Sequence, residues 1–239
     1  MSDNPDRDKM QKLPPPQLNT IQFASAWNIA TPAVYRYEDQ VWIDHFFQTG
    51  SLRLSTFAKF ASYEDEVRGD KNEGAGICFG ETKDNHTVVV AQSQGFSAAV
   101  FCCSHRLDVE LKKSFQRNSA FQITNTVGFA LEISRQLAGF KFGIEGSCIY
   151  RSDANIKRNI DFNMGDYKLD SGGFDMQMIS DAAKQLGGPE LVLLKRKNYE
   201  NQQEYRLIWE LDVVDTEFIE VNAPRARQFC RELLAYDWN

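Results

Sequence analysis

The sequence predicts an α+β fold, in which one domain is built on a central mixed, mostly antiparallel β-sheet flanked by helices. Three observations predict this class. A chain of 239 residues with 42% hydrophobic content can fill the core of one large domain. Short apolar segments with strand-like alternation outnumber helix-like segments. The links between them are short, which favours hairpins and antiparallel pairing.

The N-terminal residues differ in composition from the rest of the chain. Residues 1–20 contain Pro14–Pro16 and few apolar residues, so we expect an extended or disordered segment there. The single domain then covers residues 21–239. Within it, residues 33–37 are predicted to form a short strand. A helix should begin near Glu38 and end at Gly50, because glycine is common just after the last helical turn.

The next part of the chain alternates strands with one loop. Residues 51–57 alternate polar and apolar side chains, as a strand does. Residues 63–76 are charged and glycine-rich, which predicts a loop. We expect strands at 87–91 and 98–103, and the second should be central because it is almost continuously apolar.

The middle of the chain contains two predicted helices. Residues 121–137 have a helical apolar pattern that Gly128 weakens, and residues 175–185 form the second pattern. Gly187 and the following residues should end that helix. Between the two helices, residues 146–150 are predicted to form a strand.

The C-terminal part should complete the sheet. We interpret residues 191–195 and 205–211 as its closing strands and residues 217–221 as the last strand. Residues 223–236 are predicted to form a final helix.

The charge balance argues against a general nucleic-acid-coating protein. The net charge is −6, with 27 basic and 33 acidic side chains, whereas tight nonspecific phosphate binding needs a basic face. A local basic patch occurs at 195–197, although charge runs are often only solvated surface. The polar N-terminus does not resemble a secretion signal, and the chain lacks the roughly eighteen consecutive apolar residues of a membrane span. We therefore expect a cytoplasmic protein with no membrane partner.

Motifs for metal, disulfide and phosphate-loop chemistry are missing from the sequence. The five cysteines include no C-x-x-C, and the three histidines have no metal-ligand spacing, so we expect no metal and no disulfide framework. Neither G-x-x-x-x-G-K-[ST] nor G-x-G-x-x-G occurs, which argues against a P-loop or Rossmann nucleotide site.

The most informative motif is a polar turn that leads directly into an apolar strand at 205–211. On an extended chain, Gln202 and Glu204 would point to the same face. A fixed carboxylate with a neighbouring amide suits a reaction that stabilises a positive charge on a sugar ring, as in cleavage of the nicotinamide glycosidic bond of NAD. The alternative is that Glu204 begins a solvated strand and pairs with Arg206.

Three segments in order resemble the ADP-ribosyltransferase fold: 34–37 with its following helix, 50–56, and 202–206. They are similar to bacterial DarT-like toxin and defence enzymes, and to a related uncharacterised bacterial family with a Y-E-x-E-[YW]-R ending. The resemblance covers roughly residues 33–221 and implies a split central sheet. It also implies an NAD-dependent transferase, with NAD as co-substrate and without a metal.

The resemblance further implies roles for individual residues. The first strand supplies Arg36 to the NAD ribose and phosphates. The second segment lines the nicotinamide pocket with Ser55 and Thr56 above Leu54, although this chain has Ser-Thr-Phe where arginine-modifying members have Ser-Thr-Ser. Ser104 is a rival for the serine position. Arg68 is a candidate second phosphate or leaving-group contact.

The final segment places catalysis at Glu204, with Gln202 orienting the acceptor or the ribose. Arginine-modifying members have E-x-E, and a glutamine cannot serve as the base that this acceptor needs. The resemblance therefore favours a nucleic-acid acceptor, RNA or single-stranded DNA, contacted by Tyr199, Lys195 and Lys197.

The resemblance implies a toxin or phage-defence effector, for which an antitoxin or regulatory protein would be a further partner. Two alternatives stay open. The acceptor of ADP-ribose is a protein side chain, or the chain is a non-enzymatic interaction module.

Overall fold

The computed structural model describes residues 18–22, 28–62, 75–83, 87–93, 97–153, 155–159, 163–180, 189–212, 214 and 216–238. Residues 1–17 of the expected N-terminal segment and residues 63–74 of the expected loop lie outside this part. Arg68 therefore lies outside the described residues as well. Residues 18–20 belong to a strand.

An eight-stranded sheet forms the centre of the described structure, and all of its strand pairs are antiparallel. One path through it runs β14-β4-β7-β3-β8-β15, and β13 and β9 extend it from β7. Its strands are β3 (Val34–Glu38), β4 (Ser51–Thr56), β7 (Ala98–Ser104), β8 (Ser119–Ile123), β9 (Phe140–Ser147), β13 (Glu204–Leu211), β14 (Phe218–Asn222) and β15 (Cys230–Glu232).

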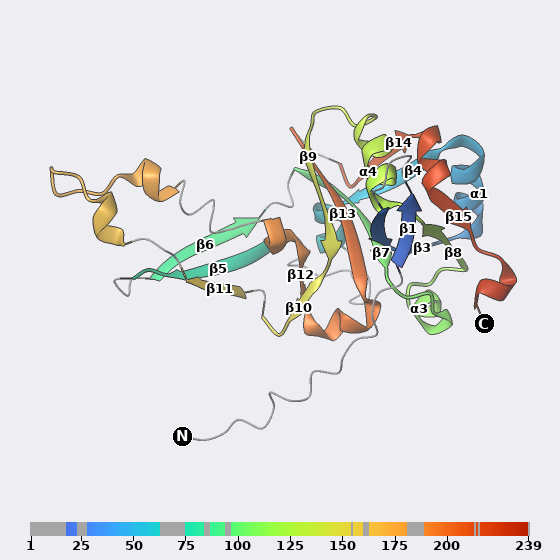
Figure 1. The fold of residues 1–239 in the computed structure, drawn as a ribbon, viewed down its shortest axis with the longest axis horizontal. Helices are drawn as coiled ribbons and strands as arrows, with labels where there is room; N and C mark the ends of the chain where they lie inside the picture. The colour runs from blue at the N-terminus through green and yellow to red at the C-terminus, as the bar shows by residue number, and fades with distance from the viewer. Residues whose placement is uncertain are drawn as a thin grey trace, which may run out of the picture.

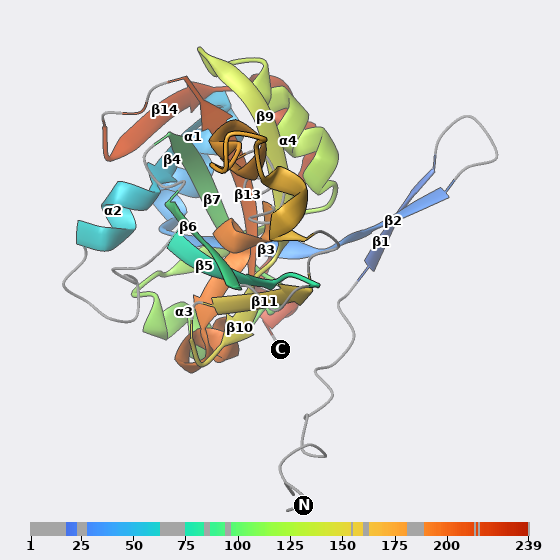
Figure 2. The same cartoon turned by 90° about the vertical axis from the view of Figure 1, so that its left-hand side faces the viewer.

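Three smaller sheets accompany the large one, and Figure 1 shows the β5–β6–β11 sheet extending from it. This sheet consists of β5 (Ala75–Glu81), β6 (Thr87–Ser93) and β11 (Asn155–Asn159). One two-stranded pair is formed by β10 (Ile149–Arg151) and β12 (Leu194–Arg196). The other is formed by β1 (Leu18–Gln22) and β2 (Asn28–Pro32), and this second pair projects on the right of Figure 2. The parallel pairs are β10–β12 and β11–β5, so the mixed pairing predicted for the central sheet is found in the smaller sheets.

The helices are short. The α-helices are α1 (Gln40–Thr49), α2 (Phe57–Ser62), α3 (Val109–Ser114) and α4 (Thr126–Ser134), and residues 176–180 are also helical. The 3₁₀-helices are η2 (Met164–Tyr167), η3 (Pro189–Leu193), η4 (Lys197–Gln202), η5 (Pro224–Phe229) and η6 (Ala235–Trp238). The fold is thus α+β, with a large antiparallel sheet flanked by helices.

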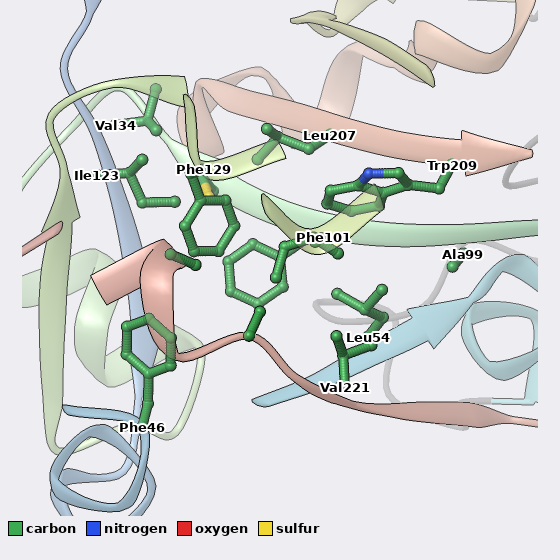
Figure 3. Packing of buried hydrophobic residues seen from close by; sticks show 14 of the residues in the cluster. Val34, Phe46, Leu54, Ala99, Phe101, Ile123, Phe129, Leu207, Trp209 and Val221 are labelled. Atoms are coloured by element: carbon green, nitrogen blue, oxygen red, sulfur yellow. The ribbon is translucent and has the colours of Figure 1, made fainter. Parts of the chain in front are cut away.

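The main core lies between one face of the sheet and the helices α1, α4 and η5. Phe46 of α1 stacks on Phe121 at 5.3 Å between ring centroids, and Phe129 of α4 lies 5.6 Å from Phe101 (Figure 3). The opposite face packs Val100 and Ile208 against Phe57 and Val192. β7 and β13 are therefore buried on both faces, which explains their nearly continuous apolar sequence.

Several predicted elements are confirmed. The strands at 33–37, 51–57, 98–103, 205–211 and 217–221 match β3, β4, β7, β13 and β14 within one or two residues, and 87–91 lies within β6. β7 is central, as predicted. The helix α1 ends at Gly50, whose φ of +84° lies in the left-handed region. A Cβ there would also meet Pro224 Cα at 2.3 Å, so glycine is required twice over.

The two longest predicted helices are wrong. Residues 121–137 divide into β8 and α4, because Asn125 leaves the strand in an extended conformation and accepts the Gly128 amide at 2.8 Å as an N-cap. Residues 223–236 divide into η5, β15 and η6 because residues 230–232 pair with β8. Pairing with a distant strand overrides the local helical pattern in both cases.

Smaller corrections affect three other predicted elements. Residues 191–193 belong to η3, so the expected strand at 191–195 is reduced to the start of β12. The strand expected at 146–150 is divided between the end of β9 and β10. Of the helix expected at 175–185, residues 176–180 are helical and residues 181–185 lie outside the described part.

Candidate active site

A gap in the central sheet lies beside β7. One edge of this strand pairs with β13 from Ala98 to Ser104. The other edge is shared: β4 pairs with residues 99–100, and β3 pairs with Ser104. Residues 101–103 have no partner strand on this edge among the described elements. The two neighbouring strands therefore separate here and leave a gap.

A cavity of about 560 Å³ lies at this gap, within the range typical of small-molecule sites. Three arginines line it, Arg36, Arg53 and Arg117, together with the carboxylates Glu38 and Glu220. We call this cavity the arginine pocket. Guanidiniums make charge-assisted hydrogen bonds to phosphate oxygens, so the three arginines suit a ligand with phosphate groups.

Arg36 is held at the gap by several contacts. Its Nη1 donates to the Cys102 carbonyl of β7 at 2.9 Å, and its Nη2 donates to Glu38 at 3.2 Å. The guanidinium carbon lies 4.6 Å from the ring centroid of Phe101. Burial opposes the charge, but the pKa of Arg36 is raised above its ordinary value because Glu38 and the neighbouring cysteines together favour the charged form. Arg36 is therefore a fixed cation.

The other two arginines are held by carboxylates at the rim. Arg117 pairs with Glu38 at 2.9 Å and with Asp39 at 2.6 Å. Arg53 pairs with Glu220 at 2.9 Å, and both side chains are more than half exposed. An incoming anion can compete for such exposed pairs because they contribute little to stability.

The pocket takes lining residues from both faces of the sheet. Phe101 belongs to the core face that carries α1 and α4. Ser55 lies directly opposite Val100, which belongs to the core on the other face of the sheet. Directly opposed residues of an antiparallel pair share a face, so the Ser55 side chain enters the pocket from that second face. The pocket therefore reaches both sides of the gap.

The predicted partners of Ser55 do not line this pocket. Leu54 and Thr56 are fully buried on the face opposite to the Ser55 side chain. Leu54 belongs to the main core, and Thr56 Oγ1 donates to the Glu217 carbonyl at 3.3 Å. Of the three residues, the structure places only Ser55 in the pocket.

Glu204 lies on the other side of β7, at the first position of β13, and its exposed fraction is 6%. Its Oε1 accepts from Arg206 Nε at 2.6 Å, and its Oε2 pairs with Lys195 Nζ. Its backbone amide donates to the Tyr150 hydroxyl at 2.7 Å. We call Glu204, Lys195, Arg206 and Tyr150 the Glu204 cluster.

Both cations of the Glu204 cluster are buried. Arg206 is fully buried, and its Nη1 donates to the Val192 carbonyl at 2.8 Å. The Lys195 ammonium lies 5.0 Å from the ring centroid of Tyr199. Burial alone would lower the pKa of Lys195, but Glu204 and the neighbouring cysteines together favour the charged form and raise the pKa. The pairing of Glu204 with Arg206 agrees with the alternative stated from the sequence, although the pair is buried and not solvated.

The turn before Glu204 differs from the extended chain that the motif predicted. Gln202 ends the 3₁₀-helix η4, and Gln203 has a left-handed φ of 43°, so the expectation that Gln202 and Glu204 share one face of an extended strand is wrong. Ser104 Oγ donates to the Gln202 carbonyl at 2.6 Å. Ser104 therefore holds this turn against the end of β7.

The three predicted acceptor contacts differ in exposure. Tyr199 and Lys195 are buried in and beside the Glu204 cluster. Lys197 is exposed at the start of η4. Only Lys197 is thus directly accessible to a large acceptor.

The structure groups the predicted site residues into two sets. Arg36 and Ser55 line the arginine pocket. Gln202, Glu204, Lys195, Tyr199 and Ser104 gather around the start of β13. Glu204 lies diagonally across from Cys102 on one face of the sheet, whereas Arg36 lies against Phe101 on the opposite face. The strand β7 therefore lies between the Glu204 carboxylate and the Arg36 guanidinium.

Sequence reasoning missed Arg53, Arg117 and Tyr150. Arg53 could have been found, because it alternates with Ser55 along the same strand. Arg117 and Tyr150 reach their positions through distant strand pairing, which no local signal reveals.

The described residues contain no group of three His, Cys, Asp or Glu side chains arranged to hold a metal ion. None of their helices is long and apolar enough to cross a membrane. Comparison with protein-family models, curated proteins and solved structures found no match to this chain.

Proposed function

We propose that the chain is an NAD-dependent ADP-ribosyltransferase that acts on a base of RNA or single-stranded DNA. The observation that carries this proposal is the state of Glu204, a buried carboxylate whose two oxygens are both held by cations at the head of a central strand. A carboxylate oriented in this way can stabilise an oxocarbenium-like ribose. Nearby lies a cavity of suitable size and charge for a dinucleotide.

In this proposal the arginine pocket binds the pyrophosphate of NAD. Arg36, Arg53 and Arg117 supply charge-assisted hydrogen bonds, and Ser55 lines the side of the gap that shares a face with Glu204. The ribose–nicotinamide bond breaks, and nicotinamide leaves as a neutral molecule with the bonding electron pair. A lone pair of the acceptor base then forms the new bond to the ribose carbon, and the acceptor loses a proton to solvent.

A nucleic-acid acceptor is supported by the basic surface next to Glu204. Arg196 and Lys197 are exposed between β12 and the turn that precedes Glu204. They can contact a phosphate backbone while the base approaches the ribose. A protein acceptor would instead rest on side-chain contacts at the same turn.

The same cluster also favours a second candidate function. Because Arg206 and Lys195 already occupy both oxygens of Glu204, the cluster can serve as a structural ion pair. The chain would then be a nucleotide-binding interaction module that uses the arginine pocket without turnover.

The test is release of nicotinamide from NAD, with RNA, single-stranded DNA or protein extract added separately. Wild type is compared with Glu204→Gln and with Glu210→Gln, a control on the same strand and the same face. We expect Glu204→Gln to lose most of the turnover and Glu210→Gln to keep it. Because Glu204→Gln weakens a buried ion pair, near-UV circular dichroism must show that the variant is folded at the assay temperature.

Three outcomes are informative. Label on nuclease-sensitive material supports the base acceptor, and label on protease-sensitive material supports a protein side chain. If folded wild type binds ADP-ribose but releases no nicotinamide with any acceptor, the transferase assignment fails and the interaction module replaces it. Full activity in Glu204→Gln would remove Glu204 from catalysis.

A further inference from the structure

Trp42 is a half-exposed aromatic residue at the edge of the arginine pocket. It lies in the first turn of α1, and 55% of its surface is exposed, although tryptophan is strongly buried in most proteins. The helix buries Ile43 and Phe46 in the main core, and Trp42 lies outside this cluster. Its side chain lines the arginine pocket instead.

The aromatic rings of the pocket differ in what covers them. The phenylalanine and tryptophan side chains in its lining are Trp42, Phe46, Phe101, Phe121 and Phe218. Phe46 and Phe121 stack on each other, and a guanidinium lies over Phe101 at 4.6 Å and over Phe218 at 5.1 Å. Trp42 instead meets the His45 ring at an angle of 89°, with 6.4 Å between the centroids. Its indole therefore offers the pocket an aromatic surface for a ligand.

The exposed indole lies at the same end of the pocket as one of the arginines. Arg117 pairs with Glu38 at 2.9 Å and with Asp39 at 2.6 Å, the two residues that precede α1. The Trp42 amide donates to the Asp39 carbonyl at 2.9 Å, so the indole is only one helical turn away. A nucleotide carries the two matching groups, because its phosphate suits the guanidinium and its flat base suits the indole.

We propose that Trp42 stacks on the nucleobase of the ligand, so that the arginine pocket recognises a nucleotide by its base as well as by its phosphates. This inference rests on the proposed function, in which the ligand is NAD and the base is adenine. The helix α1 covers the face of the sheet opposite to the Ser55 side chain. The adenosine half then lies on the α1 side of the gap, and the ribose that reacts lies on the side that Ser55 and Glu204 share.

The test compares a ligand that has the base with one that lacks it. Full-length protein is titrated by calorimetry with ADP-ribose and with inorganic pyrophosphate. Trp42→Ala should weaken ADP-ribose binding about tenfold, the loss of one stacked base, and leave pyrophosphate binding unchanged. Trp42→Phe should keep most of the affinity because it keeps an aromatic face. The matched control is Val41→Ala, since Val41 is 65% exposed on the same turn and does not line the pocket.

Fluorescence gives a second measurement that a purely structural role of Trp42 would not change. A base stacked on an indole quenches its emission, so ADP-ribose should quench wild type. The chain has four tryptophans, and Trp42→Phe is the reference that isolates this one. The quenching should be lost in Trp42→Phe although this variant still binds ADP-ribose. Pyrophosphate should quench neither protein, because it has no base.

Each result decides the proposal. Unchanged ADP-ribose affinity in folded Trp42→Ala overturns it, and so does an equal loss of affinity for ADP-ribose and pyrophosphate, because Trp42 would then only support α1. If folded wild type does not bind ADP-ribose, both the inference and the assignment of the arginine pocket fail. A protein that binds ADP-ribose through Trp42 but releases no nicotinamide keeps the inference and loses the transferase assignment.

Discussion

The Glu204 cluster and the arginine pocket lie on two sides of β7 and use charge in opposite ways. In the cluster, one carboxylate pairs with two buried cations, and the side chains of Glu204 and Lys195 are less than a tenth exposed. In the pocket, each arginine has a carboxylate partner, and the Arg53–Glu220 pair faces solvent. The cluster is therefore costly to change and slow to rearrange, whereas the pocket can exchange its internal ion pairs for a ligand. Stability should depend on the first region and ligand affinity on the second.

The largest expected effect is on stability at the cluster. Glu204→Ala leaves Lys195 and Arg206 buried without their carboxylate, so the free energy of unfolding should fall by about 3–5 kcal/mol. Urea unfolding measures this change. The control is Glu220→Ala, which removes an exposed pair and should cost less than about 1 kcal/mol. Equal losses in the two variants would show that the contrast between the regions is false.

A second substitution sharpens that result. In the Glu204→Ala background, Lys195→Met removes one of the two buried cations that lost Glu204 and keeps an apolar stem against Tyr199. The double variant should recover part of the lost stability, by about 1 kcal/mol or more, because a buried charge that has lost its carboxylate costs more than an apolar side chain of similar size. Urea unfolding of the single and double variants gives the coupling directly. No recovery would mean that the ammonium reaches water once Glu204 is absent.

The next effect concerns ligand affinity at the pocket. Arg53→Ala and Arg117→Ala should each weaken ADP-ribose binding about tenfold, the loss of one charge-assisted hydrogen bond, with little change in unfolding. Calorimetric titration measures the affinity. Arg135→Ala, at an exposed position on the α4 side, is the matched control and should bind like wild type. The pocket is not the ligand site if all three variants bind equally well.

The sequence could predict the parts of the fold in which local pattern and tertiary pairing agree. β7 and β13 are apolar because they are buried on both faces, and Gly50 ends α1 because only glycine fits there. Residues 121–123 and 230–232 were assigned to helices, whereas they pair with each other as strands across more than a hundred positions of the sequence. A local window does not contain that information.

The candidate site shows the same division. Arg36, Ser55 and Glu204 were identified from short motifs, but their separation by β7 depends on how β3 and β4 share one edge of that strand. The left-handed Gln203 turned the expected extended motif into the end of a 3₁₀-helix. Lys195 was identified as a contact for nucleic acid, and its burial against Glu204 follows from the position of β12. Residue identity suggested the chemistry, and strand topology decided which groups meet.

A smaller effect on stability is expected from the Tyr150 hydroxyl, which accepts a hydrogen bond from the Glu204 backbone amide. Tyr150→Phe removes the acceptor of the Glu204 backbone amide and should lower the free energy of unfolding by about 1–2 kcal/mol. Amide hydrogen exchange should show lost protection at Glu204 and unchanged protection at Leu207, which lies deeper in β13. Unchanged exchange at both amides would mean that this hydrogen bond does not position Glu204.

The smallest effect is a pH dependence on the cluster side of β7. Burial lowers the pKa of His105, which follows Ser104 and shares a hydrogen bond of 2.8 Å with Ser147. As pH falls below about 6.5, the unfolded chain takes up a proton on this ring before the folded chain does, so stability falls toward acid. Relative to His105→Gln, wild type should therefore lose stability between pH 7 and 5, by less than about 1 kcal/mol because the ring is only partly buried. Urea unfolding at several pH values measures the difference between the two proteins. Parallel curves would show that His105 titrates as it does in water, and that the end of β7 is as open to solvent as the rim of the arginine pocket.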